Sequence, residues 1–295
     1  MIDEKLMKNI VLVAESGADI PPELARHYRI HIVPMHVSFG DETKDDGTFP
    51  VEEICAYYEQ TSELPKTSAS TPEDFATVFD DIHDCQPEAQ ILYLAYSAAT
   101  TCSFQSGRIA AESRPYVISL DTKMVSAGQC AVVLRMAHLL EEHPEWDITQ
   151  AVTAAEDLIS RAHMCFIPDD LAYLRAGGRV SNAAALCGKL LGIHPLIEIQ
   201  DGKLKAVKKL RGKLSKLAPQ LVADYAAQWD LEQDELWLIW SPGFPQELRE
   251  PIEQSAKACG FQTIYWVKTG GVITTHGGPG AFGVVGFSMP NQSLR

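Results

Sequence analysis

The chain has 295 residues, which is enough for two domains that each have a hydrophobic core. Apolar residues make up 46% of it, as in ordinary globular proteins, and its formal net charge at pH 7 is −14. Binding to a nucleic-acid backbone needs a net basic surface, so we expect no nucleic-acid partner.

The sequence shows no signal for export or membrane insertion. Residues 1–8 carry charges at once and contain no apolar core of a secretory signal. The longest stretch without Asp, Glu, Lys or Arg, residues 269–294, is rich in Gly, Thr and Pro, unlike a membrane span. Seven Cys without a C-x-x-C pair are typical of reduced thiols. We therefore expect a cytoplasmic protein.

One segment reverses the acidic balance. Seven of the 25 basic residues lie between Lys203 and Lys216, with no acid among them. This run fits a solvated hairpin followed by a helix start, or a docking patch for an acidic or phosphorylated partner.

In the first half, apolar runs alternate with helix patterns. Thr71-Pro72 is a strong helix start, and residues 41–47 are expected to form an acidic loop. The alternation predicts a mostly parallel sheet flanked by helices. The expected strands cover residues 9–15, 30–39, 91–96 and 116–120, and the expected helices begin at 21, 51, 71, about 103 and 126.

The second half mixes hairpins with helices. Asp201-Gly202 between two alternating runs predicts a β-hairpin. We therefore expect an α/β fold of two domains, residues 1–160 and residues 161–295, the second with a mixed or antiparallel sheet. Its expected helices are 147–161, 169–176, one more before 193, 214–229 and 245–259, and its expected strands are 164–167, 193–199, 203–210, 235–240, 262–268, 271–275 and 283–289.

Familiar enzyme motifs are missing from the sequence. Gly278 to Gly283 matches G-x-G-x-x-G, but a dinucleotide site needs a helix after it, and the remaining 12 residues favour a strand. There is no G-x-x-x-x-G-K-[ST], G-x-S-x-G or H-E-x-x-H, and the nine His lack metal-ligand spacing. We expect no metal and no cofactor.

Hydroxyl groups and one His gather in three segments: Thr67 to Ser70 before a helix, Thr100 to Ser103 between a strand and a helix, and Thr274-Thr275-His276 before a glycine turn. Helix capping and turn formation would account for each segment alone. Free N–H groups and hydroxyls at helix starts also bind anions, and two such sites together would suit a carboxylate. Arg179 follows Gly177-Gly178. It is either a surface residue just beyond a helix end, or part of a segment whose glycine backbone approaches another group closely.

Along nearly its whole length the chain resembles the DegV family of fatty-acid-binding proteins. The matching segments are VAESGADIPPEL, IHIVPMHVSFG, KTSASTPEDF, SAATTCSFQSG, the long stretch from Asp169 to Gly212, and TTHGGPGAFG.

The resemblance implies that one long-chain fatty acid lies in a tunnel of the first domain, its carboxylate at the domain interface. A separate ATP-dependent fatty-acid kinase would then convert the carboxylate to an acyl phosphate for phospholipid synthesis, so the chain would not be an enzyme by itself. The family's carboxylate-binding residues fall on Thr67, Thr101 and His276. Its two Arg at the headgroup and the kinase face fall on Arg179 and Arg211. Peripheral contact with a membrane during lipid exchange is also expected.

Three positions depart from the family pattern. Thr101-Cys102-Ser103 replaces Ser-Gly-Thr, Glu15 replaces Asp, and Ala69 replaces Gln. Two alternatives stay open: a binding protein for another amphiphilic lipid acid, and a hydrolase that uses a Ser or Thr with His276. Against the hydrolase, the sequence places no Ser in a strained elbow and no acid beside His276.

Overall fold

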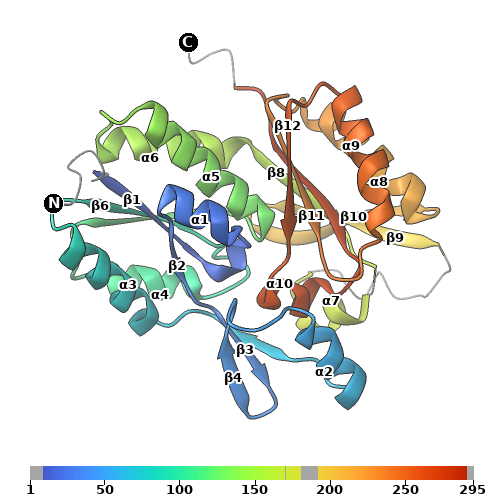
Figure 1. Cartoon of the computed structure of the whole chain (residues 1–295), viewed down its shortest axis with the longest axis horizontal. Helices are drawn as coiled ribbons and strands as arrows, with labels where there is room; N and C mark the ends of the chain where they lie inside the picture. Colours follow the sequence, from blue (N-terminus) through green and yellow to red (C-terminus); the bar gives the residue numbers. More distant parts are fainter. Residues whose placement is uncertain (1–8, 170, 181–191, 291–295) are drawn as a thin grey trace.

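The structure, a computed structural model, describes residues 9–169, 171–180 and 192–290. Two α/β parts lie side by side, the first built on a four-stranded sheet and the second on a six-stranded sheet. A small antiparallel sheet lies beneath their junction (Figure 1). The larger sheets are a parallel one of four strands and a mixed one of six, so the predicted fold class is confirmed. The boundary at residue 160 stays a prediction.

The four-stranded sheet is buried on both faces. Its strands, in spatial order, are β2 (His31–Val33), β1 (Ile10–Glu15), β6 (Gln90–Ala95) and β7 (Val117–Asp121). Helices α3 (Pro72–Cys85) and α4 (Ser103–Ala111) cover one face, and α1 (Pro22–Tyr28), α5 (Ala127–Glu142) and α6 (Ile148–Arg161) lie toward the other (Figure 1). Alternate strand residues point to opposite faces, so Val11 and Tyr93 join one core cluster while Leu12 and Leu94 join the other.

The small sheet corrects two expectations. Residues 30–39 do not form one strand, because Pro34 lacks an N–H and the chain leaves the parallel sheet there. The expected loop at 41–47 contains a strand, made possible by a tight turn at Gly40, whose φ is 63°. The sheet has the order β4 (Glu42–Asp45), β3 (His36–Phe39) and β5 (Lys66–Ser68), and α2 (Glu53–Thr61) connects β4 to β5.

The six-stranded sheet contains the predicted hairpin. Asp201 and Gly202 both have positive φ, 50° and 76°, as a type I′ turn requires. Only β11 and β12 run parallel; the other pairs are antiparallel. The strand order is β10 (Lys203–Arg211), β9 (Ile193–Gln200), β8 (Ala162–Ile167), β13 (Phe282–Phe287), β11 (Glu235–Trp240) and β12 (Thr263–Lys268).

Helix α5 joins the two parts into one core. Side chains of the parallel sheet and side chains such as Trp237 and Val285 of the mixed sheet belong to the same hydrophobic cluster as α5. Helices α8 (Leu214–Trp229) and α9 (Arg249–Ala258) cover the other face of the mixed sheet with a separate cluster (Figure 1). Two short 3-10 turns, Ser16–Ala18 and Gln246–Leu248, complete the described elements together with α7 (Leu171–Gly177) and α10 (Gly271–Gly277).

The predicted strand at 271–275 is wrong, because these residues form helix α10. Val, Ile and two Thr favour a strand, yet helix propensity is a weak preference that tertiary contacts override. The helix expected before residue 193 falls outside the described residues. None of the helices in the described part of the chain is both long and apolar enough to cross a membrane.

Candidate functional site

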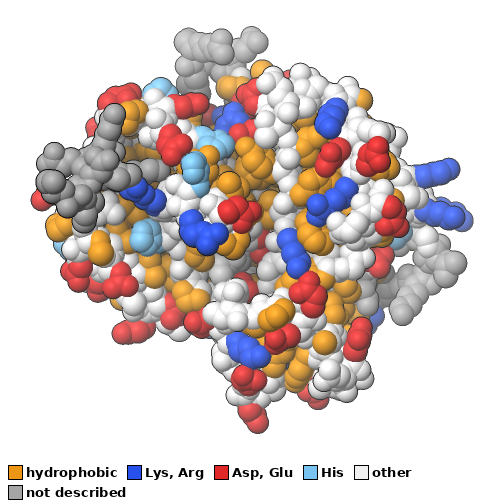
Figure 2. Space-filling view, viewed as in Figure 1, with side chains coloured by type: hydrophobic (Ala, Val, Ile, Leu, Met, Phe, Trp, Pro, Cys, Tyr) orange, Lys and Arg blue, Asp and Glu red, His pale blue; other side chains and the backbone are white. Residues whose placement is uncertain are grey.

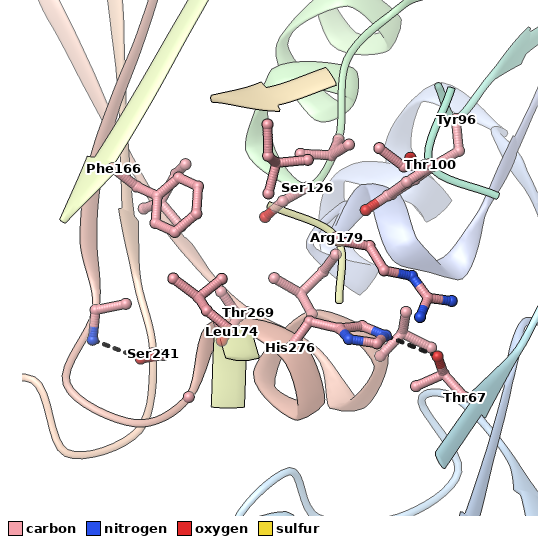
Figure 3. Close-up of a pocket in the computed structure, with 18 of the residues that line it drawn as sticks. Thr67, Tyr96, Thr100, Ser126, Phe166, Leu174, Arg179, Ser241, Thr269 and His276 are labelled. Atoms are coloured by element: carbon pink, nitrogen blue, oxygen red, sulfur yellow. Dashed lines mark hydrogen bonds between the residues drawn. The ribbon is translucent and has the colours of Figure 1, made fainter. Parts of the chain in front are cut away.

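A pocket lies between the two parts of the chain (Figure 3). Its cavity volume is about 100 Å³. Pockets that hold drug-sized ligands usually measure about 300–1,000 Å³, so this pocket has to widen to admit a ligand of that size. One end is lined by the polar residues Thr67, Thr100, Thr101, Arg179 and His276. The rest is lined mostly by apolar residues such as Met164, Phe166, Leu174, Leu204, Ile239 and Phe282, together with Ser126, Ser241 and Thr269.

The apolar lining comes from both parts of the chain. Met164, Phe166 and Ile239 belong to the mixed sheet, while the placement of an acyl tunnel within residues 1–160 stays a prediction. The first part of the chain contributes Met35, Tyr96 and Val125. The pocket is therefore formed by both parts rather than by the first alone.

Thr67 and His276 meet at the polar end of the pocket. Their Oγ1 and Nε2 atoms form a hydrogen bond of 2.8 Å, although 209 residues separate them (Figure 3). Thr67 lies on strand β5, which the sequence did not predict, and His276 lies in the last turn of α10 rather than at a strand end.

His276 is neutral at physiological pH. Burial and then the nearby Arg179 lower the pKa of the imidazole to about 4. Its Nδ1 is buried and has no hydrogen-bond partner among the described residues. A proton on Nδ1 would be buried without an acceptor, so the proton of the neutral ring lies on Nε2. The Nε2–H group then donates to Thr67. This arrangement frees the Thr67 hydroxyl proton to donate to a ligand.

Thr101 precedes helix α4 at the carboxyl end of β6, as expected, and it lines the same pocket. Its Oγ1 accepts a hydrogen bond of 3.3 Å from the backbone N–H of Ser103. Beneath this turn, buried Glu15 accepts hydrogen bonds from Ser103 Oγ at 2.9 Å and from the N–H of Tyr96 at 2.9 Å. Burial raises the pKa of the Glu15 carboxyl. Ser103 occupies the position of the Thr in the family pattern, and Glu15 that of the Asp. The longer side chain of Glu15 thus reaches the Ser103 hydroxyl.

The two expected Arg lie in different places. Arg179 lines the pocket with Thr67 and His276, and its Nη1 donates to the carbonyl of Gly177 at 2.6 Å (Figure 3). Arg211 does not line this pocket; it is exposed at the end of β10, which is the outermost named strand of the mixed sheet in the described part of the chain. The exposed members of the basic run, Lys203, Lys208, Lys209, Arg211, Lys213 and Lys216, lie on or just after that strand.

Sequence patterns missed Ser126, which lines the pocket as the residue before α5. Its φ of 49° and ψ of −135° are strained for a residue with a side chain, so the expectation that no Ser occupies a strained elbow is wrong. However, its Oγ hydrogen-bonds to the carboxylate of Asp19, whereas His276 pairs with Thr67. A Ser–His pair is therefore not assembled in the described part of this pocket.

The pocket can hold an amphiphilic anion. Hydroxyl groups supply donors at one end, where the neutral imidazole of His276 orients Thr67, and mostly apolar side chains cover the remainder. The described residues contain no group of three or more His, Cys, Asp or Glu that could hold a metal ion. A carboxylate followed by a long hydrocarbon chain matches this distribution.

A family model described as an uncharacterised protein of the DegV family matches residues 9–288. The chain belongs to the DegV family. A DegV domain-containing protein of Deinococcus radiodurans is 29% identical to this DegV-family chain, with 94% of this chain and 97% of the relative aligned. Protein DegV of Bacillus subtilis is 24% identical, with 94% and 98% aligned.

Solved structures of other family members have the same fold. A structure described as fatty acid binding of a DegV family protein from Thermus thermophilus has a TM-score of 0.84 and 27% identity, and covers 96% of this chain and 100% of that one. A structure of DegV from Bacillus subtilis has a TM-score of 0.80 at 22% identity, covering 96% and 100%, and this likeness concerns the fold.

Proposed function

We propose that this DegV-family protein binds a single long-chain fatty acid in the pocket between its two parts. The observation that carries this proposal is the pocket itself, with Thr67, Thr101 and His276 at one end and an apolar lining beyond them. The Thermus thermophilus relative, described as fatty acid binding, supports the same ligand class.

The energetics agree with this ligand. Burial of a methylene contributes about 0.8 kcal/mol, so about 16 methylenes contribute roughly 13 kcal/mol. Lost translational and rotational freedom costs about 4–15 kcal/mol, so the apolar chain alone does not secure tight binding. Hydrogen bonds from Thr67 and Thr101 to the carboxylate add affinity and fix its position, since an unpaired buried carboxylate is costly.

We further propose that the bound carboxylate is presented to a separate fatty-acid kinase, which uses ATP to form the acyl phosphate. Phosphoryl transfer depends on positioning and charge stabilisation, and the partner would supply ATP and metal. Neutral hydroxyls and a neutral His276 hold the carboxylate without quenching its nucleophilicity. Arg179, exposed yet lining the pocket, is placed to contact an added phosphoryl group.

The basic strand β10 provides a docking face for that kinase. Its exposed cations, including Arg211, form a local positive field in a chain of net charge −14. Such a field mainly accelerates encounter with an acidic partner. The proposed activity takes place in the cytoplasm, where ATP is available, with peripheral membrane contact during lipid exchange.

The ligand is tested by extracting the purified protein with organic solvent and identifying the extract by mass spectrometry. We expect one C14–C20 fatty acid per chain. If extraction yields no such acid and the protein takes up none that is added, the proposal is wrong. Another amphiphilic lipid acid in stoichiometric amount would support the first alternative, whereas turnover of an acyl ester without a partner would support the hydrolase.

A further inference from the structure

The start of helix α10 is held by two carboxylates from distant parts of the chain. Asp19 Oδ1 accepts a hydrogen bond of 2.7 Å from the N–H of Gly270, and Asp46 Oδ1 accepts one of 2.8 Å from Gly271. Asp46 also accepts a weaker bond of 3.3 Å from Val272. The first N–H groups of a helix have no partner within the helix, so these carboxylates satisfy donors that would otherwise be buried and unpaired.

The Gly270-Gly271 pair permits this close approach. A Cβ atom on Gly271 would lie 2.9 Å from Asp46 Oδ1 and 2.6 Å from the ring of Phe49. A Cβ on Gly270 would lie 3.0 Å from Asp19 Oδ1. Gly270 has no side chain to cap the helix itself, so the cap is supplied entirely from outside α10.

The three-stranded sheet holds both ends of α10. Asp46 directly follows β4 and contacts the first turn, while Thr67 on β5 contacts His276 in the last turn. Seven residues of helix span only about 10 Å, so a shift at one end is transmitted to the other. The position of the His276 imidazole therefore depends on how firmly Asp46 holds the opposite end.

We propose that Asp46, with Asp19 beside it, is a positioning residue that sets His276 against Thr67 so that Thr67 can donate to the ligand carboxylate. This role rests on the proposed function only in naming that ligand. Asp46 does not line the pocket and reaches the ligand site through α10. Loss of its carboxylate would unpair the first turn of α10 and let the imidazole move away from Thr67.

A double-mutant cycle tests whether Asp46 acts through His276. The variants are Asp46→Ala, His276→Ala and their combination, and the readout is the Kd for a fluorescent fatty acid. We expect Asp46→Ala, which removes the acceptor, to raise Kd about 10-fold in the native background and less than about 2-fold when His276 is already Ala, since coupled residues are non-additive. Equal increases in both backgrounds would overturn the proposal, because a general loss of structure would act on both.

A ligand-free measurement separates this proposal from the proposed function. Histidine labelled with ¹⁵N gives the titration midpoint of His276 by NMR, expected at about pH 4 in the native chain. Asp46→Ala should move it upward, toward the ordinary value of about 6.5, as the ring gains solvent. An unchanged midpoint would refute the positioning role even if fatty acid bound well, and a shifted midpoint would sustain it even if none bound.

Two further variants serve as controls for these tests. Asp45→Ala removes the neighbouring exposed carboxylate, which bonds His36 rather than α10, and it should leave the His276 midpoint and Kd unchanged. Gly271→Ala keeps Asp46 but drives a Cβ against its carboxylate, so it should shift the midpoint in the same direction as Asp46→Ala. If Asp46→Ala does not fold, the Gly271→Ala result decides, and an unmoved midpoint there overturns the proposal.

Discussion

Replacing Thr67 by Val removes one hydroxyl from the headgroup end of the pocket and preserves the shape of the side chain. A hydrogen bond to a charged group contributes about 1.5–3 kcal/mol, which corresponds to roughly a 10- to 150-fold increase in the Kd for fatty acid. Val keeps the preference for a strand, and position 67 pairs with Val37 of β3 through the backbone. Stability should therefore fall only by about 1 kcal/mol, from the lost bond to His276.

The assay is displacement of a fluorescent fatty acid at equilibrium, with thermal unfolding measured on the same samples. Thr43→Val is the matched control, because Thr43 lies on β4 of the same small sheet and bonds the Ser38 hydroxyl at 2.8 Å, outside the pocket lining. Its Kd should equal that of the native chain. An unchanged Kd for Thr67→Val, or an equal increase for Thr43→Val, would refute the assignment of Thr67 to the carboxylate.

Four other outcomes are expected. Thr101→Ala should raise the fatty-acid Kd about 10-fold or more, and an unchanged value in the displacement assay would remove Thr101 from the site. Arg179→Ala should lower acyl phosphate formation at every salt concentration and change fatty-acid Kd little. Arg211→Ala should slow the reaction mainly at low salt, where the positive field of β10 is unscreened. Identical salt profiles for the two variants would contradict this division of roles. The pKa of His276 is lowered in the folded chain to about 4, so the unfolded state binds more protons below about pH 6.5. The free energy of unfolding should therefore fall as the pH decreases from about 6.5 to 4. In His276→Gln, this free energy should fall less over the same pH range. Gly202→Ala should weaken the contact of the β9–β10 hairpin with the first part of the chain, because the φ of Gly202 is +76° and a Cβ would press on Ser97. The free energy of unfolding, measured with denaturant, should fall by about 1 kcal/mol or more.

Much of the fold follows from local sequence patterns. Thr71 and Asp147 form the capping boxes that helix starts of this kind predict, and the Asp201-Gly202 turn has the two positive φ angles that its residues favour. These features depend on residues within four positions of each other, so the sequence alone specifies them.

The errors arise where distant contacts decide the local structure. Residues 271–275 have β-branched side chains that favour a strand, but Asp19 and Asp46 satisfy the N–H groups of a helix there. Pro34 interrupts the apolar run from 30 to 39, and only the pairing of β3 with β4 and β5 shows that this run enters a second sheet. A single-sequence pattern contains no information about such partners.

The candidate site divides in the same way. Thr67, Thr101, Arg179 and His276 could be named from their residue types and from the family resemblance, and the structure brings all four to one pocket. The contact that gives the pair its chemistry joins Thr67 to His276 across 209 residues, so spacing could not predict it.

The neutral imidazole also could not be derived from the sequence, because its pKa depends on burial between two parts of the fold. A neutral His276 can donate from Nε2 to Thr67 only while α10 keeps its register against β5. That register is set at the other end of the helix by carboxylates from the first part of the chain. The proposed headgroup site is therefore a property of the junction: neither part alone would place the Thr67 hydroxyl proton where a ligand can accept it.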